Sequence, residues 1–173
     1  IATLVRKARG EAPNSILLDN GDFLQGNPLG DYMAYERGLK EGDLHPVVAA
    51  FNTLGIEAGT LGNHEFNYGL SFLEKALAGA KYPVVLSNLA RGKVAGTPRQ
   101  DQGFVKPYAI LEREIVDAAG QKHPIKVGVI GFTPPQIMIW DAANLAGNVE
   151  ARDVAVAAAA WVPEMKEAGA DIV

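Results

Sequence analysis

Two short apolar runs, each ending in a glycine-containing polar turn, constrain the fold of this chain most strongly. The run Ser15–Asp19 leads into Asn20–Asp22, and the run Ile56–Leu61 leads into Gly62–Glu65. A short continuous apolar run is typical of a strand that is buried on both faces of a sheet. Helical patterns follow and precede these runs, and a repeated order of strand, loop and helix predicts a layered α/β sheet.

The remaining elements follow from the same periodicities. Helices are expected where apolar residues recur at helical spacing, over residues 1–9, 29–38, 43–55, 70–80 and 151–168. We expect Gly10 to end the first helix, Asp43 to cap the third and Pro163 to kink or divide the last. Further strands are predicted at residues 84–88, 108–116, 125–132 and, incompletely, 170–173. The turn at 117–121 predicts an antiparallel hairpin, and residues 91–106 form a surface loop.

The charge distribution argues against a polynucleotide partner. The chain has 16 Lys and Arg against 20 Asp and Glu, a net charge of −4, with no basic stripe along it. A small anionic substrate stays compatible with this charge, because bound cations can outweigh it inside a cleft. The chain has no cysteine, so any metal must bind oxygen and nitrogen ligands. The longest apolar stretch, Val154–Val162, is shorter than the roughly 20 residues that span a bilayer, so no membrane partner is expected.

The polar turns supply candidate ligands. Ligand sites in open α/β sheets lie beyond the carboxyl ends of the strands, where Asp22 and the Asn63-His64 pair are predicted to lie. A carboxylate can bridge two cations, and an asparagine oxygen is a neutral ligand. His64 could protonate a leaving oxygen or stabilise charge on a phosphoryl group. Taken singly, a Gly-Asp pair is usually a turn and an Asn-His-Glu sequence a helix cap, so a non-catalytic binding module is the alternative.

Together, the blocks Gly21–Gly26 and, about forty residues later, Gly62–Phe66 resemble the middle of the calcineurin-like metallophosphoesterase signature. The resemblance extends over nearly the whole chain. Within the superfamily, the residues around both blocks look most like the bacterial 2′,3′-cyclic-nucleotide 2′-phosphodiesterase/3′-nucleotidase branch, and 5′-nucleotidases share the general plan. It implies a four-layer αββα sandwich of mixed sheets flanked by helices. It also implies two divalent metal ions (Zn, Mn, Co or similar) and attack of a metal-activated water on the phosphorus of a small nucleotide.

The resemblance also assigns roles to individual residues. Asp22 would be the carboxylate that bridges both metals, Asn63 a ligand of the second metal and His64 the catalytic histidine; no substrate-binding residue is identified. In 5′-nucleotidases the position three after the catalytic histidine is commonly aspartate, and here it is Asn67, which favours the cyclic-nucleotide branch. Bacterial members of the family are typically exported, which implies a periplasmic or otherwise exported location.

Part of the family pattern is absent from the chain. Family members carry an Asp-x-His block on a strand ahead of the position of Ile1, and two His-bearing blocks after the strand that begins near Asp171. The start at Ile1, with neither an initiator Met nor a signal sequence, looks internal or processed. We therefore expect residues 1–173 to be a fragment of one metallophosphoesterase domain that is nearly inactive on its own.

Other notable residues receive structural interpretations. His45 and His123 are expected at the surface, in a helix start and a hairpin. Trp140 and Trp161 are expected to pack rather than to stack on a nucleobase, and Asn88 is interpreted as a turn residue.

Overall fold

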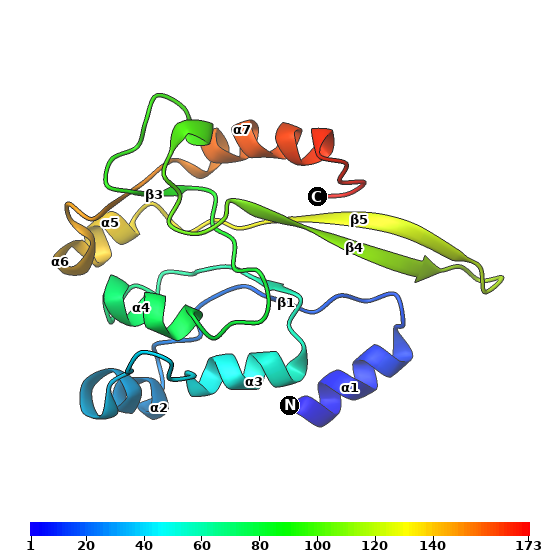
Figure 1. Cartoon of the computed structure of the whole chain (residues 1–173), viewed down its shortest axis with the longest axis horizontal. Coiled ribbons are helices and arrows are strands. Elements are labelled where there is room, and N and C mark those ends of the chain that lie inside the picture. The colour runs from blue at the N-terminus through cyan, green and yellow to red at the C-terminus, as the bar shows by residue number, and fades with distance from the viewer.

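The structure, a computed structural model, describes all residues 1–173 and arranges helices around three small sheets (Figure 1). The α-helices are α1 (Ala2–Glu11), α2 (Pro28–Asp31), α3 (Pro46–Leu54), α4 (Leu70–Leu77), α5 (Ile137–Trp140), α6 (Ala142–Leu145) and α7 (Val154–Glu167). A π-helical segment, Tyr32–Arg37, continues α2, and a 3₁₀ turn covers Pro98–Gln100. The strands are β1 (Leu18–Asp19), β2 (Ala58–Gly59), β3 (Leu89–Arg91), β4 (Tyr108–Val116), β5 (Lys122–Ile130) and β6 (Val149–Ala151).

The two strands that precede the polar turns pair in parallel. Leu18 lies opposite Ala58 and Asp19 opposite Gly59, so β1 and β2 end side by side. The next segment extends this arrangement, because Val84 forms a parallel bridge with Gly59. The chain is therefore α/β, as the sequence predicts, and the carboxyl ends of β1 and β2 meet at one edge.

The predicted strand at 84–88 does not form as a regular strand. Its backbone bonds to three different segments, since Val85 N donates to Gly59 O, Leu86 N to Lys106 O and Ser87 N to Gly131 O. Regular pairing begins later, where β3 pairs antiparallel with β6. The segment is buried as expected, but its neighbours change from residue to residue, so no continuous ladder develops.

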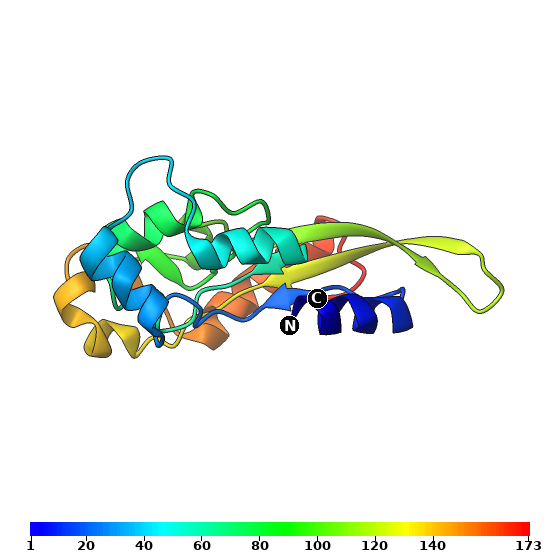
Figure 2. The same ribbon diagram turned by 90° about the horizontal axis from the view of Figure 1, so that it is seen from below.

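The predicted hairpin is confirmed and forms the longest sheet. β4 and β5 pair antiparallel over their whole length, from Tyr108 opposite Ile130 to Val116 opposite Lys122. Figure 2 shows this hairpin projecting as an arm from the body of the molecule. In Figure 1, α7 lies above the hairpin and α1 and α3 lie below it. The chain end returns to β5, where Ile172 bridges Val127 in parallel, as the strand-like pattern of 170–173 indicates.

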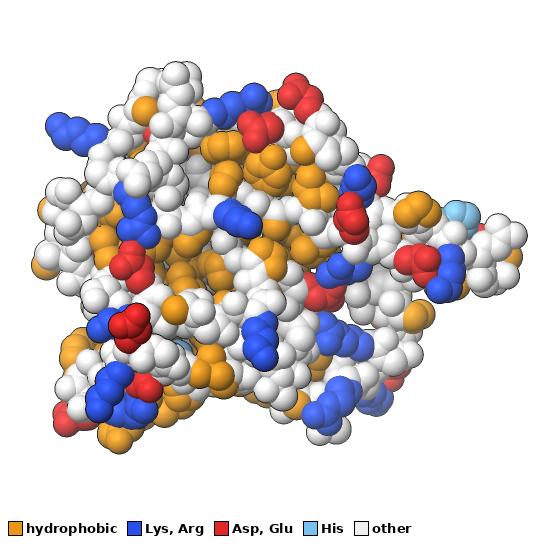
Figure 3. Space-filling view, in the orientation of Figure 1, with side chains coloured by type: hydrophobic (Ala, Val, Ile, Leu, Met, Phe, Trp, Pro, Cys, Tyr) orange, Lys and Arg blue, Asp and Glu red, His pale blue; other side chains and the backbone are white.

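The main core lies directly behind the polar turns. Leu24 follows the first turn, Leu61 precedes the second and Phe66 ends it, and all three side chains are fully buried in one cluster of 13 residues. Full burial of such a side chain contributes about 1.5–3 kcal/mol. The apolar residues that flank both motifs therefore hold the turns against one core. Figure 3 shows further apolar side chains exposed across the middle of the face seen in Figure 1.

Two predicted helix features are wrong, and a third is wrong in one of its two alternatives. α1 continues through Gly10 and ends at Glu11. α7 continues through Pro163, so that proline does not divide the helix. Asp43 does not cap α3, because its carboxylate pairs with Arg37 and accepts from Lys40 N instead. His45 is the cap, with Nδ1 accepting from the backbone N–H of Val47 at 3.3 Å.

His45 is also buried, against the surface position expected for it. Its side chain is 0 % exposed and its ring meets Phe72 edge to face. Burial lowers the pKa of His45 below the ordinary value, which favours the neutral ring. His123, in contrast, is exposed on the hairpin beside Asp117, as expected.

Candidate functional site

The buried carboxylate of Glu65 ties the two polar turns together. Its Oε1 accepts from the backbone N–H groups of Phe23 (2.7 Å) and Leu24 (3.1 Å). Its Oε2 accepts from those of Asp22 (2.6 Å) and Gly62 (2.7 Å). Three of these donors belong to the first turn and the two residues after it, and one belongs to the turn after β2. A single side chain, 0 % exposed, thus fixes the relative position of both turns.

Glycine is required where the turns approach each other. Gly21 has a φ of +82°, and a Cβ built there would lie 2.9 Å from the carbonyl carbon of Leu61. A Cβ on Gly62 would clash with the Asp22 carboxyl group, at 2.7 Å from its Cγ. Asp22 itself has a φ of +62° and is the sole non-glycine residue with positive φ. Non-glycine residues in this region carry backbone strain, which is frequent at functional sites.

The structure brings the three residues of the sequence prediction together. Asp22 Oδ1 accepts from the backbone N–H of His64 at 2.9 Å, and Asn63 lies between Gly62 and His64 on the same turn. Asp22 is exposed, whereas Asn63 and His64 are half-buried. The three residues therefore lie on adjoining turns at the carboxyl ends of β1 and β2, and their individual roles stay predictions.

Negative charge accumulates beneath this surface. The pKa of Asp19 is raised to about 6, chiefly by burial and less by the nearby Glu65 and Asp22 carboxyl groups, while the hydrogen bond from the backbone N–H of Gly21 opposes the rise. Burial also raises the pKa of Glu65, and its four backbone hydrogen bonds oppose that effect. The Tyr82 hydroxyl is buried without a hydrogen-bond partner, and burial with the charges of Asp19 and Glu65 raises its pKa. Several carboxyl groups at short range favour a cation beside them.

These residues fit part of a divalent-cation site. Asp22 supplies carboxylate oxygens and Asn63 an amide oxygen, which are donors that such cations accept. No group of three or more His, Cys, Asp or Glu side chains is arranged to hold a metal ion. Metal sites usually use at least three protein ligands per ion, so the donors described here form an incomplete set.

A chain of side-chain hydrogen bonds leads away from His64. Its Nδ1 lies 2.8 Å from Asn67 Oδ1, and Asn67 Nδ2 donates to Asp141 Oδ1 at 2.9 Å. Asp141 is buried at the junction of α5 and α6. Asn144, from α6, donates to the carbonyls of Phe66 (3.2 Å) and Asn67 (3.1 Å). The turn that carries His64 is therefore anchored to residues more than seventy positions later in the chain.

Asn88 and the two tryptophans take structural positions of different kinds. Asn88 is fully buried, where it donates to the carbonyls of Thr133 and Arg152 and accepts from Thr133 N, so it is an internal crosslink rather than a turn residue. Trp161 packs against Tyr108, as expected. Trp140 is 59 % exposed, against the packing role expected for it.

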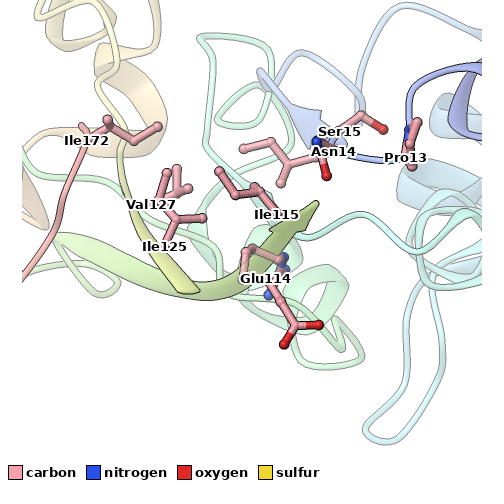
Figure 4. A pocket seen from close by; sticks show the side chains of 10 residues that line it. Pro13, Asn14, Ser15, Glu114, Ile115, Ile125, Val127 and Ile172 are labelled. Carbon is pink, nitrogen blue, oxygen red and sulfur yellow. The ribbon is translucent and has the colours of Figure 1, made fainter. Parts of the chain in front are cut away.

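A separate pocket is lined by none of the residues of the two polar turns. It is lined by the segment before β1, by β4 and β5 and by Ile172 near the chain end (Figure 4). Ile115, Ile125 and Val127 give it an apolar side, while Asn14 and Glu114 add polar groups. None of the sequence-predicted site residues lines this pocket, so the candidate site is an accessible surface at the strand ends.

The chain is similar to known proteins over almost its whole length. No family model matches the chain. The chain is 52 % identical over 172 residues to a 2′,3′-cyclic-nucleotide 2′-phosphodiesterase/3′-nucleotidase of Haemophilus influenzae, covering 99 % of this chain and 25 % of that protein. It is 53 % identical to the protein of that name from Salmonella typhimurium, covering 99 % of this chain and 26 % of that protein.

The crystal structure of the calcineurin-like phosphoesterase YfkN from Bacillus subtilis superposes with a TM-score of 0.86 at 43 % identity, covering 99 % of this chain and 50 % of that one. The likeness therefore covers almost all of the fold described above. The chain spans about a quarter of the length of the two nucleotidases.

Proposed function

This chain belongs to the calcineurin-like phosphoesterase family, and we propose that it carries part of the active site of a metal-dependent phosphoesterase acting on 2′,3′-cyclic nucleotides and 3′-nucleotides. One observation carries the proposal. Glu65 joins the two polar turns, so that the Asp22 carboxylate contacts the backbone of His64 at 2.9 Å. A candidate metal ligand and the residue that carries the candidate proton donor are therefore in direct contact.

Asp22 and Asn63 would hold divalent cations such as Zn²⁺, Mn²⁺ or Co²⁺. Such cations supply a water nucleophile at neutral pH and neutralise charge on a phosphoryl group. The carboxylates of Asp19 and Glu65 lie behind these donors and add negative charge to the site. The glycines at 21 and 62 keep the two turns close enough for donors from both to reach one ligand.

The imidazole of His64 would act on the leaving group. Its Nδ1 faces Asn67, so Nε2 is the ring nitrogen left for the substrate. A histidine in this position can donate a proton to the leaving oxygen or stabilise charge on the phosphoryl oxygens. The neutral Asn67 orients the ring without adding a charge, where an aspartate would add one.

The test is a substrate comparison in a protein of the relatives' full length that contains these residues. With Mn²⁺ or Zn²⁺ present, we expect faster hydrolysis of 2′,3′-cyclic AMP than of 5′-AMP. His64→Asn should lower kcat by about 10²-fold or more, the usual contribution of a general acid. His123→Asn, which changes the exposed histidine of the hairpin, is the matched control and should leave the rate unchanged.

Two results would reassign the protein. A preference for 5′-AMP would make it a 5′-nucleotidase. Absence of hydrolysis together with absence of Mn²⁺ or Zn²⁺ binding in calorimetry would make it a non-catalytic binding module.

We further propose a periplasmic enzyme whose partner is a small nucleotide rather than a polynucleotide or a membrane. The charges of both signs are interspersed, which does not favour a nucleic-acid backbone. None of the helices has the length and apolar character needed to cross a bilayer. Fractionation of cells that produce the full-length protein tests the location, and recovery in the cytoplasmic fraction would contradict it.

A further inference from the structure

We propose that Asp141 is a positioning residue that acts through Asn67 to hold the imidazole of His64 in its Nδ1–H tautomer. The residues form one line of contacts, with 2.8 Å from His64 Nδ1 to Asn67 Oδ1 and 2.9 Å from Asn67 Nδ2 to Asp141 Oδ1. The catalytic consequence rests on the proposed function of His64, whereas the tautomer itself does not.

Hydrogen-bond chemistry fixes the direction of this line. An ionised carboxylate only accepts hydrogen bonds, so the Asn67 group that faces Asp141 is the NH₂. The amide oxygen of Asn67 must then face His64. An amide oxygen also only accepts, so Nδ1 of His64 carries the proton. Nε2 is then the ring nitrogen available to a substrate. It carries a lone pair in the neutral ring and an N–H in the cation.

The position of Asp141 makes it a firm anchor. Its side chain is 8 % exposed, its backbone N–H donates to Ile137 O at 2.9 Å and its carbonyl accepts from Leu145 N at 3.0 Å. Asn144 of α6 donates to the carbonyl of Asn67, and Asp141, the residue just before α6, accepts from its side chain, so both the backbone and the side chain of Asn67 are held. Asn67 therefore has little freedom to turn its amide without losing a partner.

The carboxylate at this position is poorly explained by folding stability. Its second oxygen, Oδ2, is buried without a hydrogen-bond partner. A buried acceptor without a partner lowers stability, so replacement by the neutral and isosteric asparagine should be tolerated. Asparagine at 141 does not fix the direction of the hydrogen bond to Asn67, because its amide group can either accept from Asn67 or donate to it.

The experiment observes the ring nitrogens of this chain directly, by ¹⁵N NMR at about pH 8, where imidazoles of ordinary pKa are neutral. The chain has three histidines, and a His64→Gln variant assigns the signals of His64. His45 is an internal reference, because its Nδ1 accepts from Val47 N and its ring must be the Nε2–H tautomer. We expect opposite tautomers for His64 and His45 in the unaltered chain.

Asp141→Asn should convert His64 to a mixture of tautomers and leave His45 unchanged. The double variant Asn67→Asp with Asp141→Asn should restore the Nδ1–H tautomer, because the carboxylate at 67 accepts from both neighbours. In the full-length protein, Asp141→Asn should lower kcat about 10- to 100-fold with little change in KM, and the double variant should recover part of the loss.

The proposal is overturned if His64 is the Nε2–H tautomer in the unaltered chain. It is also overturned if Asp141→Asn keeps a dispersed amide spectrum and an unchanged His64 tautomer. Should that variant fail to fold, the tautomer in the double variant decides, and an Nε2–H ring there overturns the proposal. The NMR result needs neither metal nor substrate, so loss of the phosphoesterase assignment would leave it standing.

Discussion

Replacing Glu65 by Gln tests whether one buried carboxylate holds the two polar turns together. Each carboxylate oxygen accepts two backbone N–H groups, from Phe23 and Leu24 on one side and from Asp22 and Gly62 on the other. In glutamine one oxygen becomes an NH₂ group, which faces two N–H donors. Two hydrogen bonds to a charged group are then lost.

The expected loss follows from that count. A hydrogen bond to a charged group is worth about 1.5–3 kcal/mol, so two are worth about 3–6 kcal/mol. Burying an amide costs less than burying a carboxylate, which offsets part of the loss. We expect the free energy of unfolding to fall by about 3 kcal/mol, a large share of the roughly 5–15 kcal/mol of a typical domain.

The assay is urea unfolding followed by circular dichroism at about pH 8, so that the carboxylate is ionised. Glu114→Gln is the matched control, because that carboxylate is exposed and pairs with Lys122 on the hairpin. An exposed pair is worth about 0–1 kcal/mol. If Glu65→Gln costs no more than Glu114→Gln, Glu65 does not hold the turns together.

Three further predictions concern the same turns. Burial raises the pKa of Asp19 to about 6 in the folded chain, so its contribution to stability is present below about pH 4 and is lost as the pH rises through 6. In EDTA, the free energy of unfolding of Asp19→Asn, relative to that of the unaltered chain, should therefore be about 1–2 kcal/mol higher at pH 7 than at pH 4, after allowance for partial exposure. An equal difference between the two chains at both pH values, measured by urea unfolding, would contradict this. Gly62→Ala should cost about 1–3 kcal/mol, because its Cβ would meet the Asp22 carboxyl group, whereas Gly10→Ala, with open space around it, should be neutral or stabilising in thermal unfolding. Calorimetry with Mn²⁺ should show weak binding to the chain alone, since its donors form an incomplete set, and tight binding would show that further ligands lie within these residues.

Local patterns in the sequence predict the parts of the fold that local forces determine. The hairpin of β4 and β5 and the parallel pairing of β1 with β2 follow from apolar runs bounded by turn residues. The burial of His45 was not predicted, because its environment comes from Phe72 on another helix. Likewise, the segment from Val84 bonds to three distant segments in turn, and no local periodicity records such a change of partners.

The residues of the candidate site were likewise predicted only where a local motif marks them. Asp22, Asn63 and His64 were predicted because each belongs to a compact motif after a strand. Glu65 lies in that motif too, but its role appears only when its four backbone donors are seen together. Asp141 lies 74 positions from Asn67 and carries no motif, so only the folded structure relates it to His64.

Organisation of the turns and affinity for metal are separate properties of this chain. The contact between Asp22 Oδ1 and His64 N depends on Glu65 and on two glycines, all of which lie within the described residues. Metal affinity depends on the number of ligands, and no group of three His, Cys, Asp or Glu side chains is arranged here to hold an ion. The turns should therefore keep their arrangement without metal, because a buried carboxylate and not a cation joins them. It follows that Glu65 preorganises the Asp22 carboxylate during folding, so that a cation that binds there does not have to order this ligand.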